Sequence, residues 1–335
     1  MTTHPLRDER LRAALAQLAA AAVLVALVGW IAAGVAADLR ARNLVPGLGF
    51  LRQVAGFGIS EGPAFAPTDS YGRALVVGLA NTLRVAVAGI ALATVWGFAL
   101  ALARLSGNVL LGGLARGAIE ALRNTPLALQ LVLWISLLRA LPPIGQALGL
   151  GWIGGGDGPR RAWLLLSQKG AALAWPRLDG GLGLDLPTAG RFGYEGGLVL
   201  SPEFAALLFG LVVYTGAFIA EIVRSGVEAV PRGQVEAARA LGLRDGQALW
   251  RVVVPQARRI IIPPLTNQYL NLAKNSSLAI FIGYPDLFNV SQTVGNQTGQ
   301  FVVVVGLVMT VYLAISLLTA LVMNAYARRT RLVER

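Results

Sequence analysis

The feature that constrains this chain most is a series of long segments in which charged residues are nearly absent. The clearest of them runs from Ala13 to Ala37 and contains 25 residues without a charged side chain. An α-helix needs roughly 20 apolar residues to cross a bilayer. Charged residues make up only 14% of the whole chain, against about 25% in soluble domains. The sequence therefore predicts an all-α, polytopic membrane protein.

The apolar runs predict six transmembrane helices. They cover residues 13–37, 74–102, 126–141, 203–223, 260–282 and 301–325. The first run could instead be a cleaved signal peptide. Because it is longer than the 7–15 residues of a typical signal-peptide core, we interpret it as an uncleaved anchor.

The distribution of Lys and Arg predicts the orientation of these helices. With the N-terminus inside, seventeen of these residues fall in inner segments and ten in the longer outer segments. Positive residues accumulate on the cytoplasmic side of membrane proteins, so both termini are expected in the cytoplasm. The same rule accounts for the net charge of +12 without a nucleic-acid partner.

The chain is expected to divide into three parts. Residues 1–73 form the anchor helix and an external loop, and residues 74–325 form a helical core. Within that core, residues 142–202 are rich in Gly and carry scattered charge of both signs, which indicates an external insertion of undetermined structure. Residues 326–335 form a basic cytoplasmic tail.

Several kinds of site are excluded by composition. Zero cysteines exclude disulfides, thiolate metal sites and cysteine nucleophiles. The single histidine, His4, lies near the N-terminus and gives little support to a catalytic or zinc site. The chain also contains no P-loop motif, so it does not bind ATP in that way. We expect no metal, no cofactor and no catalytic residues.

The long basic segment from Arg224 to Arg259 lies between two apolar runs and carries the strongest local signal. It contains seven arginines and three acidic residues. Gly242 can provide a left-handed cap for a short helix before it. Asp245 can N-cap a second helix, and Pro255 is expected to end the usable helix before the next span. Two such helices would form a rigid knob for another protein, whereas an ordinary solvated loop is the alternative.

The motif in this segment has a fixed spacing of Glu-Ala-Ala, three residues, Gly, nine residues, and aliphatic-x-aliphatic-Pro. Its members are Glu236, Ala237, Ala238, Gly242, Val252, Val254 and Pro255. This spacing resembles the cytoplasmic coupling loop of bacterial ABC importer permeases, where Ile and Leu are usual in place of the two valines. The resemblance implies a loop that docks on a separate ATPase subunit and transmits its closure to the membrane helices.

Other segments resemble permeases for polar amino acids of the histidine and glutamine type. They are residues 81–83, 120–130, 214–224 and 274–278, with Asn124 where the family usually has Gly. The order of the segments is that of the family, over about residues 74–325. The chain is most similar to permeases of general L-amino-acid and glutamate/glutamine/aspartate/asparagine importers, which carry an extra N-terminal helix before a five-helix core.

This resemblance implies the type I ABC importer permease fold in a bacterial inner membrane. It also implies an L-amino acid as substrate and three protein partners. These are an ABC ATPase subunit, a second permease subunit, and an external substrate-binding protein. The second permease subunit could be an identical copy or a homologue, and the subgroup resemblance favours a homologue.

Two cations lie inside predicted spans. Arg84 is ten residues into the second span, or ~15 Å from its outer end, and Lys274 is about fourteen residues into the fifth. A charge near the midplane costs at least ~2.5 kcal/mol on insertion scales, so it indicates a function. Both cations suit the carboxylate of an amino acid. Candidates for hydrogen bonds that orient the substrate are Asn81, Thr82, Asn275, Ser276 and Ser277.

A structural role for these polar residues is the alternative. The cations could pair with a carboxylate such as Glu221, and the small polar residues could join helices. Because Glu221 lies near the inner end of its span, it is better placed to pair with Arg224 than with Arg84.

The sequence leaves more than one class of function open. The first is the permease subunit of an ATP-driven, binding-protein-dependent importer of L-amino acids. The second is an ion-gradient-driven secondary transporter or channel, which would predict an inverted repeat with interrupted helices. No convincing repeat is present. A membrane-embedded enzyme is a distant third, because no nucleophile–base pair stands out.

Overall fold

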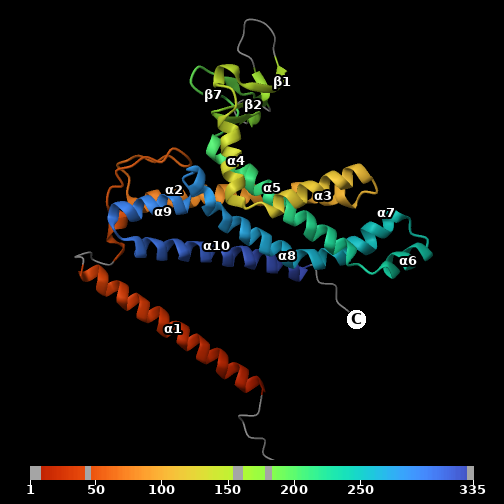
Figure 1. Cartoon of the computed structure of the whole chain (residues 1–335), viewed down its shortest axis with the longest axis horizontal. Helices are drawn as coiled ribbons and strands as arrows, with labels where there is room; N and C mark the ends of the chain where they lie inside the picture. Colours follow the sequence, from red (N-terminus) through yellow and green to blue (C-terminus); the bar gives the residue numbers. More distant parts are fainter. Residues whose placement is uncertain (1–8, 42–46, 154–160, 178–182, 330–335) are drawn as a thin grey trace, which may run out of the picture.

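The computed structural model describes residues 9–41, 47–153, 161–177 and 183–329. Its α-helices are α1 (Glu9–Ala41), α2 (Tyr71–Leu105), α3 (Val109–Asn124), α4 (Leu127–Arg139), α5 (Pro202–Glu228), α6 (Arg232–Ala240), α7 (Asp245–Ala248), α8 (Val254–Asn275), α9 (Leu287–Thr298) and α10 (Phe301–Arg329). Shorter helical segments are η2 (Leu48–Arg52), η3 (Ile144–Gln146), the π-helical turn η4 (Leu249–Val253) and η5 (Ser276–Ile282). The strands are β1 (Leu148–Ile153), β2 (Arg161–Ser167), β3 (Gly170–Leu173), β4 (Trp175–Arg177), β5 (Gly183–Asp185), β6 (Thr188–Ala189), β7 (Tyr194–Glu195) and β8 (Leu198–Leu200). Figure 1 shows their arrangement.

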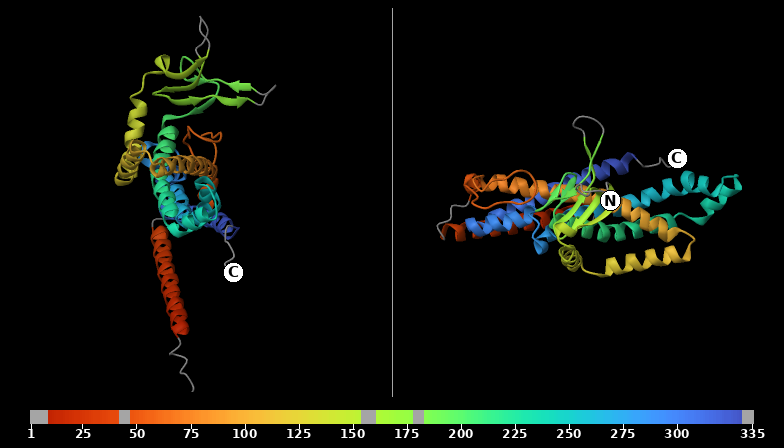
Figure 2. Two further views of the ribbon diagram at one scale, coloured as in Figure 1. Left: turned by 90° about the vertical axis from the view of Figure 1, so that its right-hand side faces the viewer. Right: turned by 90° about the horizontal axis from the view of Figure 1, so that it is seen from above.

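Three of the described helices are long and apolar enough to cross a membrane, namely α2, α5 and α10. The helices α3 and α4 are bent by 108° relative to each other. If this pair is counted as one broken span, it adds a fourth. The first predicted span falls in α1, which projects away from the other helices in Figures 1 and 2. The described residues thus support three or four spans, and the predicted count of six is not confirmed.

Two predicted spans have a different local structure from the one expected. Residues 109–124, which lie between the second and third predicted spans, form α3, and the short third span is reduced to the 13 residues of α4. Proline disfavours helical geometry in the residue before it, and Thr125 before Pro126 is extended. The fifth predicted span is divided as well, because α8 passes into η5 and the chain then forms α9, which was not predicted.

The core of the bundle is the contact between α2 and α5. At this contact Gly97 faces Ile219, and a Cβ on Gly97 would lie 2.6 Å from that side chain. Gly216 similarly faces Trp96, at 2.5 Å from a would-be Cβ. Small residues let helix backbones approach closely, and in a membrane this packing takes the place of hydrophobic burial. These glycines therefore let α2 and α5 pack closely together.

The external insertion contradicts the all-α prediction. Among the described residues of 148–200, antiparallel strands form a six-stranded sheet in the order β7-β6-β2-β3-β8, with β1 also paired to β2, and β4 pairs with β5. Alternation of apolar and small residues, as in Leu148–Ile153, is a period-2 pattern typical of strands. On one face, the Tyr194 hydroxyl donates to Ser167 Oγ at 2.7 Å, and burial raises the pKa of Tyr194. Figure 1 shows α4 rising from the other helices to this sheet.

Two predicted regions lie outside the described residues. His4 belongs to residues 1–8, and most of the basic tail belongs to residues 330–335.

Candidate functional site

The basic segment after α5 folds into two helices joined by a tight cap at Gly242. Gly242 has φ +82°, the left-handed conformation that glycine adopts at little cost. Its N–H donates to Arg239 O at 2.9 Å, and Leu243 N–H donates to Ala238 O at 3.1 Å. These two bonds are those of the Schellman motif, which satisfies the last carbonyls of a helix. The predicted left-handed cap is therefore confirmed.

The start of the second helix differs from the prediction. Asp245 is the first residue of α7, and Arg244 occupies the N-cap. Gln247 Oε1 accepts the N–H of Arg244 at 3.0 Å. The Asp245 carboxylate instead accepts from Arg239 Nε at 2.8 Å, so it ties α7 to α6 across the Gly242 turn. The prediction that Asp245 is the N-cap is therefore wrong, because its carboxylate forms an ion pair with α6 instead.

Pro255 does not end the helix as predicted. The chain is helical from Asp245 through α7, the π-turn η4 and α8 to Asn275. Proline lacks an N–H and its ring clashes with the carbonyl four residues earlier. A π-turn widens the helix by one residue, and η4 lies directly before this proline. The short helix α7 is thereby joined without a break to the long helix α8.

The outer surface of this segment is unusually apolar. Leu241 is 84% exposed and Trp250 is 72% exposed, although both lie among charged residues. Ala238 and Ala248 are buried beneath them, whereas Glu236 and Ala237 are exposed, and Val252, Val254 and Pro255 are half-buried. We call residues 232–255 the coupling segment. Its exposed apolar side chains give another protein something to bind.

Arg84 contacts residues of two other segments. Its guanidinium stands over the ring of Phe204, 5.4 Å from the centroid, and Phe204 is in the first turn of α5. Its Nη1 is 3.9 Å from Glu61 Oε2, in the loop before α2, and the Arg84 side chain is 46% exposed. Arg84 therefore lies beside the end of α5 that is farthest from the coupling segment, and its depth in a membrane stays a prediction.

Asn81 and Thr82 are fully buried and bind backbone atoms of distant segments. Asn81 Nδ2 donates to Pro285 O at 2.9 Å and to Glu61 O at 3.1 Å. Thr82 Oγ1 accepts the N–H of Leu287 at 3.0 Å. These bonds fasten α2 to the start of α9, which is a structural role. A role for the two residues in the substrate path stays a prediction.

The polar run from Lys274 to Ser277 divides between the interior and a cavity. Ser276 is buried, and its hydroxyl donates to Ala273 O at 2.8 Å. Asn275 is half-buried at the end of α8. Ser277 Oγ donates to Lys274 O at 2.8 Å, and both residues line a cavity between α8, η5, α9 and α10.

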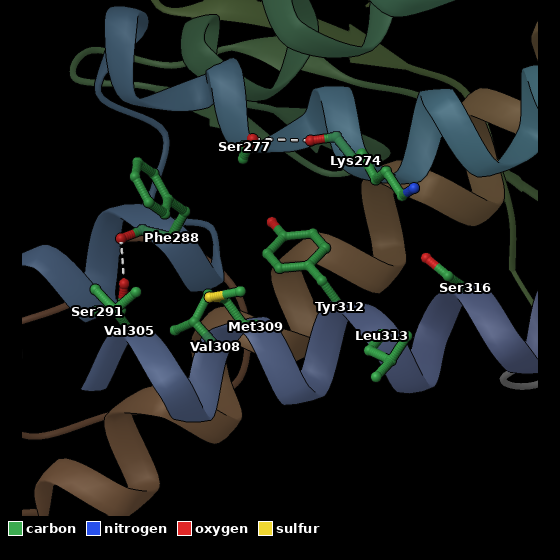
Figure 3. Close-up of a pocket in the computed structure, with 10 residues that line it drawn as sticks. All are labelled: Lys274, Ser277, Phe288, Ser291, Val305, Val308, Met309, Tyr312, Leu313 and Ser316. Atoms are coloured by element: carbon green, nitrogen blue, oxygen red, sulfur yellow. Dashed lines mark hydrogen bonds between the residues drawn. The ribbon is translucent and has the colours of Figure 1, made fainter. Parts of the chain in front are cut away.

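The cavity has a volume of about 410 Å³ and lies between α8, η5, α9 and α10. It is lined by Lys274, Ser277, Phe288, Ser291, Val305, Val308, Met309, Tyr312, Leu313 and Ser316. Figure 3 shows Tyr312 pointing from α10 toward η5, with the ammonium of Lys274 to one side. The Tyr312 hydroxyl also donates to the buried Asp286 Oδ2 at 3.2 Å. A small zwitterion would find both cationic and hydroxyl groups here.

Comparison with known proteins identifies the family. Residues 87–332 match the family described as "binding-protein-dependent transport system inner membrane component". The chain belongs to this family. The matched residues include the coupling segment and the cavity of the permease.

Named relatives cover nearly the whole permease. It is 38% identical to the general L-amino acid transport system permease protein AapQ of Rhizobium johnstonii, over 98% of this chain and 94% of that protein. It is 42% identical to the Escherichia coli strain K12 protein described as "Putative amino-acid ABC transporter permease protein YhdX", over 97% of this chain and 95% of that protein. These findings confirm the family predicted from the coupling motif.

A solved structure supports the fold of the permease. The structure titled "Crystal structure of an amino acid ABC transporter with histidines" matches with a TM-score of 0.56 and 24% identity, over 77% of this chain and 95% of that one. At this identity the likeness establishes the fold alone. The coarse fold prediction, a type I ABC importer permease, is therefore supported, with an added sheet.

The end of the helix bundle next to the coupling segment carries a compact ion-pair cluster. Glu221 Oε2 accepts from Arg104 Nη1 at 2.9 Å, and Arg224 Nε donates to Glu221 Oε1 at 3.2 Å. Arg224 also pairs with Glu228. The predicted pairing of Glu221 with Arg224 is confirmed, and Arg104 adds a second cation. The cluster joins α2 to α5 directly before the coupling segment.

Sequence reasoning missed several residues that shape the two sites. Leu241 and Trp250 carried a signal, since apolar side chains in a basic segment indicate a contact surface. Tyr312 and Ser316 are four residues apart in the last span, so they share a helix face. Asp286 gave no signal, because its burial depends on how η5 and α9 fold back. Among the described residues no group of three or more His, Cys, Asp and Glu side chains could hold a metal ion.

Proposed function

We propose that this chain is the membrane-spanning permease subunit of an ATP-driven, binding-protein-dependent importer of L-amino acids. The observation that carries this proposal is the coupling segment. Its Schellman-capped helix turn presents Leu241 and Trp250 to solvent, and it continues through η4 into α8. The names of the relatives AapQ and YhdX support amino acids as the transported class.

In this proposal, three proteins complete the transporter. An ABC ATPase subunit binds the coupling segment and hydrolyses ATP, so the permease itself is not an enzyme. A homologous permease subunit forms the other half of the translocation path. A substrate-binding protein delivers the amino acid to the opposite side. The chain lies in a bacterial inner membrane with both termini in the cytoplasm, as the Lys and Arg distribution predicts.

The uninterrupted helix gives the coupling segment a mechanical route to the cavity. Trp250 and Lys274 are 24 residues apart along the η4–α8 helix, a path of ~36 Å at 1.5 Å per residue. A shift of Trp250 on an ATPase would therefore be passed along this continuous helix, which contains Pro263 and Pro264, to the residues that line the cavity. A loop that ended at Pro255 would not transmit a displacement in this way.

We assign the substrate path to two places along the permease. Lys274 and Ser277 form the polar wall of the cavity, where the ammonium would hold the carboxylate of the solute. Arg84 would meet the carboxylate earlier, at the outer end of α5, where its guanidinium is partly exposed. The surrounding helices are held in place by Asn81, Thr82 and Ser276. Asn275 lies in the chain between Lys274 of the cavity wall and the structural residue Ser276.

Uptake in membrane vesicles tests the proposal. Vesicles that contain the permease, its ATPase and the binding protein should accumulate labelled L-amino acids when ATP is supplied, with the proton and sodium gradients collapsed by ionophores. Vesicles without ATP should not. Uptake that follows the ion gradient and ignores ATP would instead indicate the secondary transporter left open by the sequence.

A further inference from the structure

The sheet of the insertion carries two rows of aliphatic residues on one face. Two rows of paired residues run across the strands β1, β2, β3 and β8. The first row is Leu148, Leu166, Ala171 and Leu200, and the second is Leu150, Leu164, Leu173 and Leu198. Side chains of directly paired residues lie on the same face of a sheet. A water-exposed domain has no reason to carry such a face unless something apolar covers it.

Part of this face covers a second cavity, of about 500 Å³, between the sheet and the helices α4 and α5. Every residue that lines the cavity is aliphatic or aromatic, including Leu164 and Leu173 of the sheet, Leu138 of α4 and Ala205 of α5. A buried water needs two to four polar partners, and this lining offers almost none. The cavity is therefore unsuited to water.

The cavity is continuous with the lipid-facing surface of the helices. Leu92 in the middle of α2, Leu137 of α4 and Phe209 of α5 all line it and are about half exposed. Exposed apolar side chains on spanning helices face hydrocarbon in a membrane. An acyl chain can pass from that hydrocarbon into the cavity without meeting a polar group. An extended protein segment cannot, because its backbone N–H and C=O groups would be left unsatisfied there.

One polar pair stands at the end of the same two helices. Arg139 Nη2 donates to Glu203 Oε1 at 3.0 Å, and the Arg139 side chain is 60% exposed. Arg139 follows the cavity residue Leu138 directly, and Glu203 is two residues before Ala205. Arginine has five N–H donors, and the structure gives one of them to Glu203. The others are available for the phosphate of a lipid whose chain enters beside them.

We propose that this cavity is a binding site for one acyl chain of a membrane phospholipid, with Arg139 placed for its phosphate. The lipid fills the space between the insertion and the bundle, so the sheet lies on lipid and helix rather than standing free in water. This inference is independent of which solute the permease carries.

A cavity-filling variant tests the proposal. Ala205→Phe places a ring in the cavity, whereas Leu133→Phe adds a ring on the exposed face of α4 outside it and serves as the matched control. The purified permease would be photolysed with a phospholipid that carries a diazirine on its acyl chain, and native mass spectrometry would count retained phospholipids. We expect the wild type and Leu133→Phe to retain a phospholipid and to crosslink within α4, α5 or β2–β3. We expect Ala205→Phe to lose both signals.

A second measurement does not depend on the folding of that variant. Trp134 lines the cavity and its indole N–H is buried without a hydrogen-bond partner. Brominated acyl chains quench tryptophan fluorescence on contact. In nanodiscs of brominated phospholipid, the emission of Trp134 should already be quenched, so Trp134→Phe should lower the total emission very little. Trp250→Phe should instead remove emission that is not quenched. Three results would overturn the proposal. They are an unquenched Trp134, lipid retention in Ala205→Phe equal to that of the wild type, and a crosslink from the cavity to another protein in place of lipid.

Discussion

Substitution of Gly242 isolates the contribution of backbone conformation to coupling. Gly242 has φ +82°, and no heavy atom lies within 4 Å of the position that a Cβ would occupy. A side chain would therefore meet no steric obstacle, and its cost would come from the left-handed backbone alone. That conformation costs an ordinary residue roughly 1–2 kcal/mol, and Asn less, because Asn is found at such caps. A β-branched side chain should cost the most.

These costs translate into a graded loss of the capped turn. One to two kcal/mol corresponds to a factor of about 5–30 in a conformational equilibrium. We therefore expect Gly242→Asn to retain most of the coupling, Gly242→Ala to lose a large part of it, and Gly242→Val to abolish it. The assay is binding-protein-stimulated ATP hydrolysis and uptake in proteoliposomes, normalised to inserted permease.

Gly246 provides the matched control for this series. It lies in α7, has equally open surroundings and no positive φ. Gly246→Ala should therefore leave coupling unchanged, since Ala favours a helix relative to Gly. Coupling by Gly242→Val at the wild-type level would refute the role of the turn. An equal loss in Gly246→Ala would show that any added methyl group on this surface is harmful.

Three further substitutions separate the roles of the other sites. Arg84→Ala should abolish uptake without reducing the amount of inserted permease, because a partly exposed ion pair with Glu61 contributes at most about 1 kcal/mol to stability. Arg84→Lys should retain part of the uptake. Normal uptake by Arg84→Ala would exclude a substrate role. Lys274→Ala should abolish uptake while ATPase binding persists, and Lys274→Arg should restore part of it, whereas full uptake by the Ala variant would remove Lys274 from the path. Trp250→Ala should weaken copurification of the ATPase and change the stability of the permease by no more than about 0.5 kcal/mol. Trp175→Ala, at an exposed residue of the sheet region, should leave copurification unchanged. Equal copurification in both variants would exclude Trp250 from the contact.

The parts of the structure that could be predicted from the sequence are those in which local chemistry decides. Apolar length predicted α2, α5 and α10, because a run without charges has few alternatives to a membrane helix. The turn at Gly242 was also predictable, since few other residues adopt that conformation. The resemblance of the coupling motif then gave the family, which the comparisons confirm.

The parts that could not be predicted depend on distant segments. Asp245 was expected to cap a helix, but Arg239 lies within reach of it only after α6 and α7 fold together. Pro255 was expected to stop a helix, and only the π-turn before it lets the helix continue. The contact of Arg84 with Phe204 joins two helices that are far apart in the sequence, so Arg84's own helix could not predict it.

The insertion shows a different limit. Its strands are short, and their apolar pattern is interrupted by Gly and Pro, so the period-2 alternation of Leu148–Ile153 does not continue through the insertion. Pairing makes the pattern visible, because the aliphatic residues of β1, β2, β3 and β8 align only across strands. Sequence reasoning along the chain does not reveal which residues will be neighbours in a sheet.

The most direct test of the central claim is a crosslink between the coupling segment and the ATPase. The chain contains no cysteine, so a single cysteine can be placed by Leu241→Cys, at an exposed apolar position of that segment. Phe192→Cys, equally exposed in the sheet region, is the control. With a maleimide–benzophenone reagent, we predict that Leu241→Cys crosslinks the permease to its ATPase subunit and that Phe192→Cys does not. A crosslink to the ATPase from position 192, or none from position 241 in an assembled transporter, would contradict the account.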